Sequence, residues 1–167
     1  MADQSVRGTM SDSTALPDPR ARTMALQGLA NRVVRGLLRT PLVSRGVGGR
    51  LVTLYIVGRK SGRRYTIPVA YTRDGGDLLI GTPFGWGRNL RTGEPVEIRL
   101  KGRRRQADVR AYSGEAEVTA AYATMTRDNK AFAKFNNVRF DADGNPSPED
   151  LHLAWMAGAR AFRLTPR

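Results

Sequence analysis

The sequence predicts an α+β fold that is mainly β, in which six mostly antiparallel strands form a closed or partly open barrel with added helices. Five short runs between residues 51 and 112 are β-branched or alternate apolar with polar residues. Three of the segments that separate these runs are short enough to turn hairpins. A final run of the same kind, ARAFRLTP, lies near the C-terminal end.

The six strands are predicted at residues 51–57, 65–73, 77–82, 95–100, 105–112 and 159–166. Between the second and third, Asp74-Gly75-Gly76 is a strong hairpin signal, because glycine adopts the positive φ that hairpin turns require. The run 65–73, YTIPVAYTR, is expected to be one strand.

Helices are predicted at the start of the chain, after the third strand and between the last two strands. Residues 23–40 form an amphipathic basic helix that Pro41 ends; it either covers an apolar end of the core or lies on an anionic membrane. The segment 114–158 is a helical excursion and insertion. It holds one helix over 114–135, with Ser113 as a candidate N-cap, and a short helix that Ser147 caps and Gly158 ends.

The length of 167 residues suits one domain. Residues 1–22 are polar and have no apolar period, so we predict a disordered tail followed by a single domain over 23–167. The absence of cysteine excludes disulfides, thiolate zinc sites and cysteine nucleophiles. No stretch has the length of a signal peptide or a membrane span, so a soluble, cytoplasmic protein is expected.

Positive charge is concentrated in the first two thirds of the chain. The formal net charge of +13 divides into +5 over residues 1–50, +8 over 51–110 and 0 over 111–167. Such an excess attracts nucleic acid, an acidic lipid surface or a polyanionic small molecule, although runs of charge are also ordinary solvated surface.

Several familiar site patterns fail on spacing. In GRKS, Arg59 separates the glycine and lysine that a phosphate-binding P-loop keeps adjacent. The DADGNP segment has calcium-loop spacing, but Pro146 stands where the sharp turn needs glycine, so we interpret it as a turn. His152 has no serine or carboxylate constellation near it in the sequence, and no metal site is expected.

One loop is predicted to bind a ligand. The stretch GRKSGRR, between the first two strands, combines a turn that leaves backbone amides free with a serine hydroxyl and four cations, which suits an anionic group. Farther along, TPFGWGRNL offers a hydroxyl, an aromatic plane, a cation and an amide where a strand meets a helix. That mixture suits a flat heterocycle with polar edges and an anionic tail.

Together these linked motifs resemble the deazaflavin-dependent nitroreductase and quinone reductase family, over about residues 50–112 and in the last strand. The resemblance implies a six-stranded split β-barrel of the FMN- and deazaflavin-binding type. It also implies that reduced coenzyme F-420 donates a hydride to an organic acceptor such as a quinone, an enone or a nitro compound. The phosphate and oligoglutamate tail of that cofactor would supply an anion for the basic loop.

The resemblance also assigns site residues. It implies contacts to the phosphate and tail from Arg59, Lys60, Ser61 and Arg64, a place beside the ring for Thr82, and matches to a Trp-x-x-Asn-Leu motif in Trp86 and Asn89. Tyr65 stands where the family often has arginine. Where relatives that reduce nitro drugs have acceptor-side tyrosines, this chain has Asn129, Phe132 and Phe135. The proton donor and catalytic residues stay unassigned, and the insertion 136–158 is a candidate lid.

Two alternatives stay open beside this reading. The barrel could bind FMN or another flavin, or act as a carrier without turnover. The chain could instead be a non-enzymatic nucleic-acid or membrane-surface binder, with Tyr55, Tyr65 and Tyr71 stacking on bases. On the preferred reading the partner is a small-molecule acceptor and no nucleic acid is expected, while peripheral membrane contact through the helix at 23–40 and a homodimer both stay open.

Overall fold

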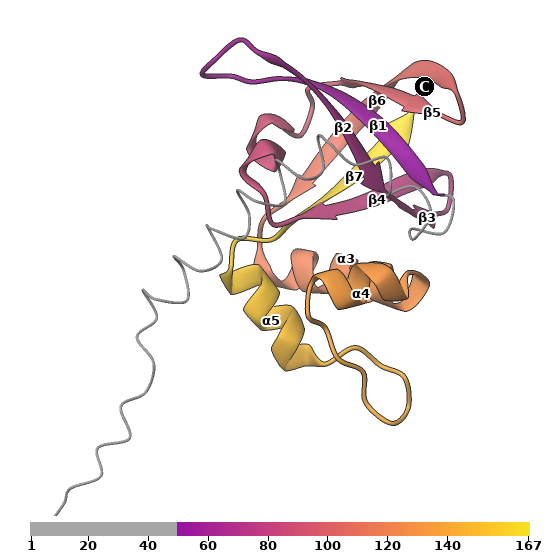
Figure 1. The fold of residues 1–167 in the computed structure, drawn as a ribbon, viewed down its shortest axis with the longest axis vertical. Helices are drawn as coiled ribbons and strands as arrows, with labels where there is room; N and C mark the ends of the chain where they lie inside the picture. The colour runs from indigo at the N-terminus through magenta and orange to yellow at the C-terminus, as the bar shows by residue number, and fades with distance from the viewer. Residues whose placement is uncertain (1–49) are drawn as a thin grey trace, which may run out of the picture. The chain divides into compact units, whose positions relative to one another are not determined.

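The computed structural model describes residues 50–167 (Figure 1). The predicted tail (1–22) and the predicted basic helix (23–40) lie outside the described residues. The strands are β1 (Leu51–Val57), β2 (Arg64–Ala70), β3 (Thr72–Asp74), β4 (Asp77–Thr82), β5 (Val96–Leu100), β6 (Arg103–Tyr112) and β7 (Arg160–Pro166). The helices are the 3-10 helix η1 (Gly85–Asn89) and the α-helices α3 (Glu115–Asp128), α4 (Lys130–Phe135) and α5 (Pro148–Met156).

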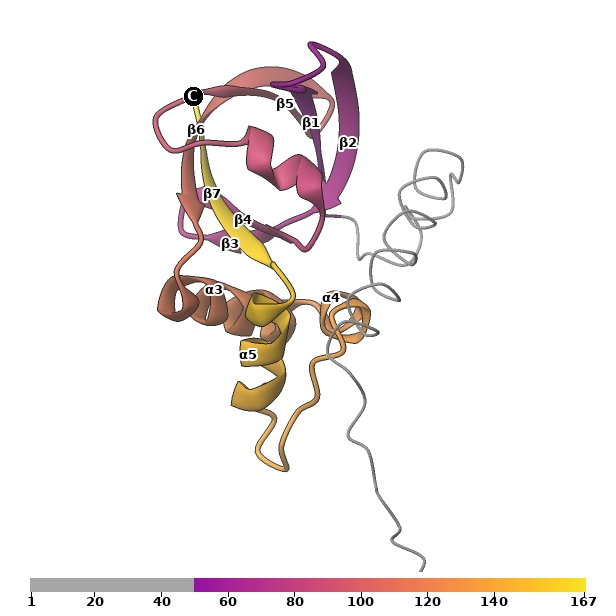
Figure 2. The same cartoon turned by 90° about the vertical axis from the view of Figure 1, so that its left-hand side faces the viewer.

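All seven strands form one antiparallel sheet in the order β2-β1-β5-β6-β7-β4-β3. Figure 2 shows this sheet curling round on itself. The prediction of a mainly β, antiparallel barrel with added helices is confirmed, and the curled sheet is a half-barrel consistent with a split barrel.

The sheet has seven strands and not the predicted six, because the run 65–73 forms two strands that pair with different neighbours. Its first part is β2, which pairs with β1, and its last part is β3, which pairs with β4. At the break the side chain of Tyr71 is buried, and its backbone N–H donates to the Arg50 carbonyl over 3.1 Å. The two parts are therefore the opposite edges of the sheet.

The predicted hairpin after β3 is confirmed. Asp74 pairs with Asp77, and Gly75 between them has a φ of +63°. The β5–β6 hairpin is equally tight: Leu100 pairs with Arg103, and its turn residues Lys101 and Gly102 have φ values of +48° and +79°. Positive φ at both turn positions matches the right-handed twist of the strands.

The interior of the curled sheet is the main hydrophobic core. Alternate residues of β1 point into it, so Val52, Leu54 and Ile56 are buried while their neighbours are partly or fully exposed. The buried members of this barrel core are Val52, Leu54, Ile56, Tyr71, Leu78, Ile80, Leu90, Val96, Ile98, Ala107, Val109, Phe162 and Leu164.

A second core lies between the sheet and the helices. Helix α3 packs against β3, β4 and β7, and Figures 1 and 2 show all three α-helices on that side of the sheet. The buried members of this second core are Leu79, Val118, Ala121, Tyr122, Met125, Ala133, Val138, Leu151, Ala159 and Ala161. Strand β4 separates the two cores, which is why five of its six residues, from Leu78 to Thr82, are buried.

The single helix expected over 114–135 is wrong. Asn129 is extended (φ −135°, ψ 102°), and its side chain accepts hydrogen bonds from the N–H groups of Ala131 and Phe132, so a new helix begins there. The predicted cap is also displaced: Gly114 is the N-cap of α3, with no side-chain cap bond. The Ser113 carbonyl instead accepts the indole N–H of Trp155 over 3.0 Å.

The predicted cap and end of the short helix, and the predicted turn before it, are confirmed. The Ser147 hydroxyl accepts the Asp150 N–H over 3.3 Å at the start of α5, and Gly158 follows the helix with a φ of +95°. Asp141 folds its segment into a turn, because its Oδ1 accepts from the N–H groups of Asp143 and Asn145. In residues 50–167 no group of three His, Cys, Asp or Glu side chains could hold a metal ion.

None of the helices in the described part of the chain has the length and apolar character needed to cross a membrane.

Candidate functional site

The basic loop, residues 58–64, is folded by its own backbone. The Gly58 N–H donates to the Arg63 carbonyl and the Gly62 N–H to the Gly58 carbonyl, both over 2.7 Å. A Cβ on Gly58 would lie 2.7 Å from the Ser61 hydroxyl and 2.8 Å from the Tyr65 ring, so a side chain there would displace both. The loop is therefore a compact turn with a defined conformation.

Asn89 joins this loop to η1. Its Oδ1 accepts the backbone N–H of Arg59 over 3.2 Å, and its Nδ2 donates to the Trp86 carbonyl over 2.9 Å. The Arg59 guanidinium adds a bond to the Arg88 carbonyl over 3.3 Å. Two segments about thirty residues apart in the chain thus form one structural unit.

The outer surface of the loop presents donors for an anion. Arg59, Lys60, Arg63 and Arg64 are all exposed, and none forms an ion pair with another residue of the described range. The backbone N–H groups of Lys60 and Ser61 have no hydrogen-bond partner among residues 50–167. Cations beside free amides are the donor set that binds phosphate and carboxylate, so these residues fit the polyanionic tail of a deazaflavin.

Ser61 lies beside Tyr65, the second residue of β2. The Ser61 hydroxyl accepts the Arg63 N–H over 3.3 Å and lies 3.5 Å from the Tyr65 hydroxyl. Ser61 is exposed, and its own hydroxyl proton is free to reach a ligand or Tyr65. Tyr65, in the place of an expected arginine, packs its ring against Gly58.

The predicted ring-side residues shape the turn after β4. Thr82 is 2% exposed, and its hydroxyl accepts the Phe84 N–H over 3.1 Å. Its methyl group lies 2.8 Å from where a Cβ on Gly87 would stand, so η1 packs closely over Thr82. Trp86 is half-buried against the barrel core. A Cβ at Gly85 would meet no atom of residues 50–167 within 4 Å, so the exposed start of this turn is not packed against other parts of the described structure.

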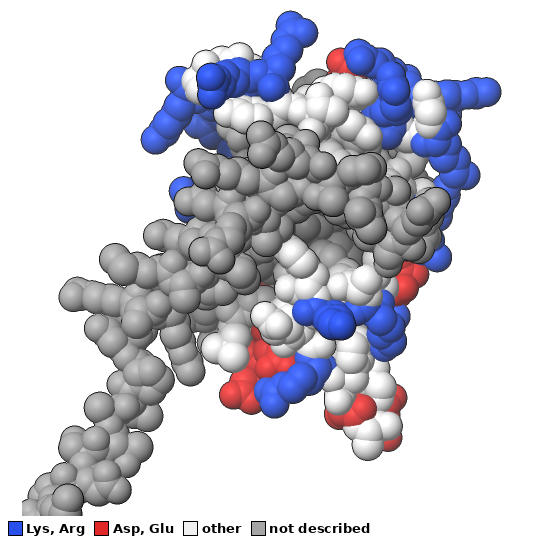
Figure 3. Space-filling view, viewed as in Figure 1, with Lys and Arg blue, Asp and Glu red and all other residues white. Residues whose placement is uncertain are grey.

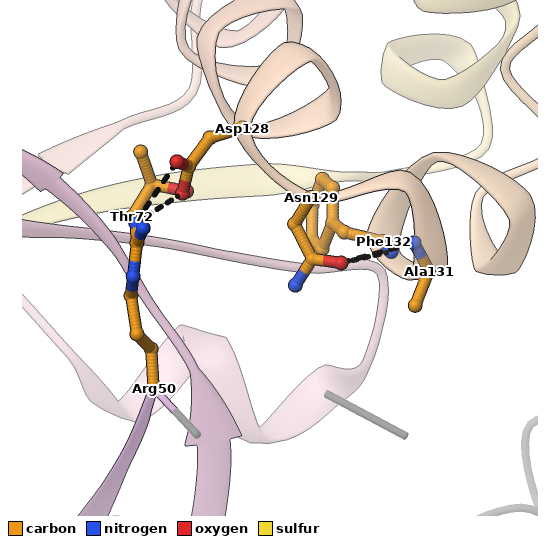
Figure 4. Close-up of polar contacts among 6 residues, drawn as sticks. All are labelled: Arg50, Thr72, Asp128, Asn129, Ala131 and Phe132. Atoms are coloured by element: carbon orange, nitrogen blue, oxygen red, sulfur yellow. Dashed lines mark hydrogen bonds and ion pairs between the residues drawn. The ribbon is translucent and has the colours of Figure 1, made fainter. Parts of the chain in front are cut away.

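The three predicted acceptor-side residues have different surroundings. Asn129 caps α4 (Figure 4), while Phe132 packs into the second core, 5.2 Å from the Tyr122 ring between centroids. Phe135 is 49% exposed and meets the Phe84 ring edge-on at 6.0 Å. Helix α4 thus approaches the turn after β4 through Phe135. At its other end, Asn129 and Phe132 lie close to Ala70, Tyr71, Thr72 and Met125, with no space for a water molecule between them.

Two features of this region left no signal in the sequence. Asp128, at the end of α3, accepts the Arg50 guanidinium on both carboxylate oxygens and the Thr72 hydroxyl over 2.8 Å (Figure 4). The Tyr122 hydroxyl is buried without a hydrogen-bond partner in the described structure, and burial raises its pKa. Both depend on contacts between segments far apart in the chain.

Two proteins with solved structures are similar to this chain. The conserved hypothetical protein Rv2991 of Mycobacterium tuberculosis has a solved structure with 14% identity and a TM-score of 0.44, over 75% of this chain and 78% of that one. A protein described as a putative 5-nitroimidazole antibiotic resistance protein of Bacteroides thetaiotaomicron has 10% identity and a TM-score of 0.40, over 77% of this chain and 80% of that one.

Among curated proteins none matches the chain. A family model described as F-420H(2)-dependent quinone reductase matches residues 32–139, which include the basic loop, η1 and the acceptor-side residues. The chain therefore belongs to the F-420H(2)-dependent quinone reductase family.

Proposed function

We propose that the protein is an oxidoreductase that transfers a hydride from reduced coenzyme F-420 to an organic acceptor, such as a quinone or an enone. This proposal rests on the two hydrogen bonds of the Asn89 side-chain amide, which join the basic loop to the turn after β4. A polyanion site and a candidate ring site are thereby held in a fixed relation, as a cofactor with a flat ring and an anionic tail requires.

In this proposal the basic loop binds the anionic tail. Lys60, Arg64 and Arg59 supply charge, and Ser61 supplies a hydroxyl and a free backbone N–H. Because the turn is already folded by its backbone bonds and by Asn89, little conformational entropy is lost when an anion binds. Charge-assisted hydrogen bonds then contribute about 1.5 to 3 kcal/mol each where water is excluded.

The turn after β4 holds the ring in this account. The buried Thr82 and the close packing at Gly87 fix the turn, and the open space at Gly85 admits a ligand. Trp86 borders it with a half-buried aromatic surface. When bound, the reduced deazaflavin supplies the hydride chemistry, while the protein orients it and excludes water.

The acceptor is expected on the side of α4. Phe135, together with Phe84, presents an exposed aromatic surface next to the turn, which suits the flat apolar ring of a quinone. Phe132 and Asn129 support this helix from the second core and from its cap. No tyrosine stands on α4, so we assign no proton donor from this chain.

Fluorescence titration of the purified full chain with oxidised F-420, with FMN in parallel, tests the proposal. Saturable F-420 binding, and transfer from reduced F-420 to a soluble quinone, are expected. Tighter binding of FMN, visible as a flavin absorbance spectrum, would favour the flavin-binding alternative. Absence of F-420 binding would overturn the proposal.

A further inference from the structure

A second group of cations lies at the opposite end of β1 from the basic loop. We call residues 99–105 the arginine hairpin; its five exposed cations are Arg99, Lys101, Arg103, Arg104 and Arg105. Val57 of β1 pairs with Arg64 of the basic loop, whereas Val52 pairs with Leu100 of the hairpin. Figure 3 shows Lys and Arg side chains in two separate groups over these hairpins. The proposed cofactor site uses only the first.

The charge of the arginine hairpin is largely uncompensated. Arg104 pairs with Glu97 over 2.7 Å, and the other four cations form no ion pair within residues 50–167. Arg99 and Arg104 stand directly opposite each other on neighbouring strands. Like charges in that position repel and destabilise the pair. An anionic surface at the hairpin would relieve this repulsion.

The aromatic residues distinguish between two kinds of polyanion. Single-stranded nucleic acid needs open aromatic faces on which bases stack. The Tyr55 ring near the hairpin is covered by the Arg104 guanidinium, 4.4 Å from its centroid. Tyr71 is 5% exposed, and Tyr65 pairs with Ile56 at the far end of β1. The described residues therefore offer no open stacking face at the hairpin.

We propose that the arginine hairpin docks the protein on an anionic lipid surface. Its cations surround the tip of a narrow two-residue turn, which suits insertion among lipid headgroups.

Vesicle co-sedimentation without cofactor tests the docking surface. The full chain is mixed with vesicles of phosphatidylcholine and phosphatidylglycerol, or of phosphatidylcholine alone, at rising salt. We expect binding only to the anionic vesicles, weakening as salt increases. The variant Arg99→Gln, Lys101→Gln, Arg103→Gln, Arg105→Gln should lose about fivefold in affinity per cation. Arg104 is kept because it pairs with Glu97 and stacks on Tyr55.

A charge-matched control neutralises four exposed cations of β3 and the helical region: Arg73→Gln, Arg127→Gln, Lys130→Gln and Lys134→Gln. It should lose much less vesicle affinity than the hairpin variant. The smaller variant Lys101→Gln, Arg103→Gln serves if the fourfold change disturbs folding, as judged by circular dichroism. Equal losses in the hairpin and control variants would show a diffuse charge effect and overturn the proposal.

Three further outcomes separate this inference from others. A hairpin variant that keeps vesicle binding but loses binding to a single-stranded DNA oligonucleotide would replace the lipid partner with nucleic acid. Vesicle binding that depends on the hairpin, in a chain that fails to bind F-420, would support the docking surface and remove the proposed function alone. Intact F-420 binding with no hairpin-dependent vesicle binding would remove only the docking surface.

Discussion

The two halves of the sheet differ in how they are covered. In the half formed by β7, β4 and β3, the strands lie between the barrel core and the helices, and β4 is buried almost throughout. In the half formed by β2, β1, β5 and β6, one face points into the barrel and the other carries exposed and partly exposed side chains. Both basic hairpins belong to the second half. The covered half is therefore the more deeply buried of the two, and the open half carries both groups of exposed cations.

The largest effect is expected from a large-to-small change in the covered half. Leu79→Ala should lower the free energy of unfolding by about 2 to 5 kcal/mol, because Leu79 is 3% exposed and packs among the helices. The matched change Val57→Ala, at a side chain 54% exposed in the open half, should stay within about 0.5 kcal/mol. Denaturant unfolding measures both. Equal losses would contradict the contrast between the halves.

An ion pair between the buried carboxylate of Asp150 and the exposed side chain of Arg139 tests the helical region as a function of pH. Hydrogen bonds from the Arg139 side chain and backbone lower the pKa of Asp150 to about 2. Because the folded state favours the charged carboxylate, Asp150 stabilises the fold at pH values above the ordinary pKa of an aspartate. This contribution is lost as pH falls from about 4 to 2. Asp150→Asn should cost about 1.5 to 3 kcal/mol at neutral pH and flatten that acid loss. An unchanged acid profile in urea unfolding would contradict this assignment.

Asn89→Ala should act locally on the open half. It removes the acceptor for the Arg59 N–H and the donor to the Trp86 carbonyl, at a cost of about 1 kcal/mol in stability. Because the cations of the basic loop remain, polyanion affinity should fall while its salt dependence stays similar. Trypsin should also cut the released loop faster in the folded protein. The control is Gln106→Ala, at an exposed residue. Cleavage of Asn89→Ala at the same rate as this control would argue that the two Asn89 hydrogen bonds do not hold the loop.

The smallest effect is expected at Tyr122. Tyr122→Phe removes a buried hydroxyl that lacks a partner within residues 50–167, so stability should stay level or rise by up to about 1 kcal/mol. Burial raises the pKa of this hydroxyl, so the folded state holds the proton more tightly and wild-type stability falls as pH rises above about 10. The variant should show less of this alkaline loss in thermal unfolding. A marked destabilisation at neutral pH would mean that the hydroxyl has a partner.

The fold was predictable wherever the pattern is local. Alternation marked β1, and Gly75 and Ser147 marked a turn and a cap, because each acts on its own neighbours. The division of residues 65–73 was not predictable in the same way, because it depends on which strand each part joins. The break at Asn129 depends on a side chain competing successfully with the continuing helix.

The candidate site was also predictable only where the signal is local in the chain. The residue types of the basic loop and of η1 were recognisable as motifs, but the bond from Asn89 to Arg59 joins two loops and exists only in the folded chain. Asn89 was expected to contact the cofactor, whereas here both ends of its amide bond to the protein. The burial of Thr82 likewise follows from packing against Gly87, which spacing along the chain does not reveal.

The central claim is that the basic loop of the open half holds the anionic tail of a deazaflavin. Fluorescence titration of oxidised F-420 into the wild type and into Lys60→Ala, Arg64→Ala tests it most directly. We expect saturable wild-type binding that weakens with salt and falls about tenfold or more in the double variant, which keeps its fold because both side chains are exposed. Equal affinity in the two proteins would contradict the claim.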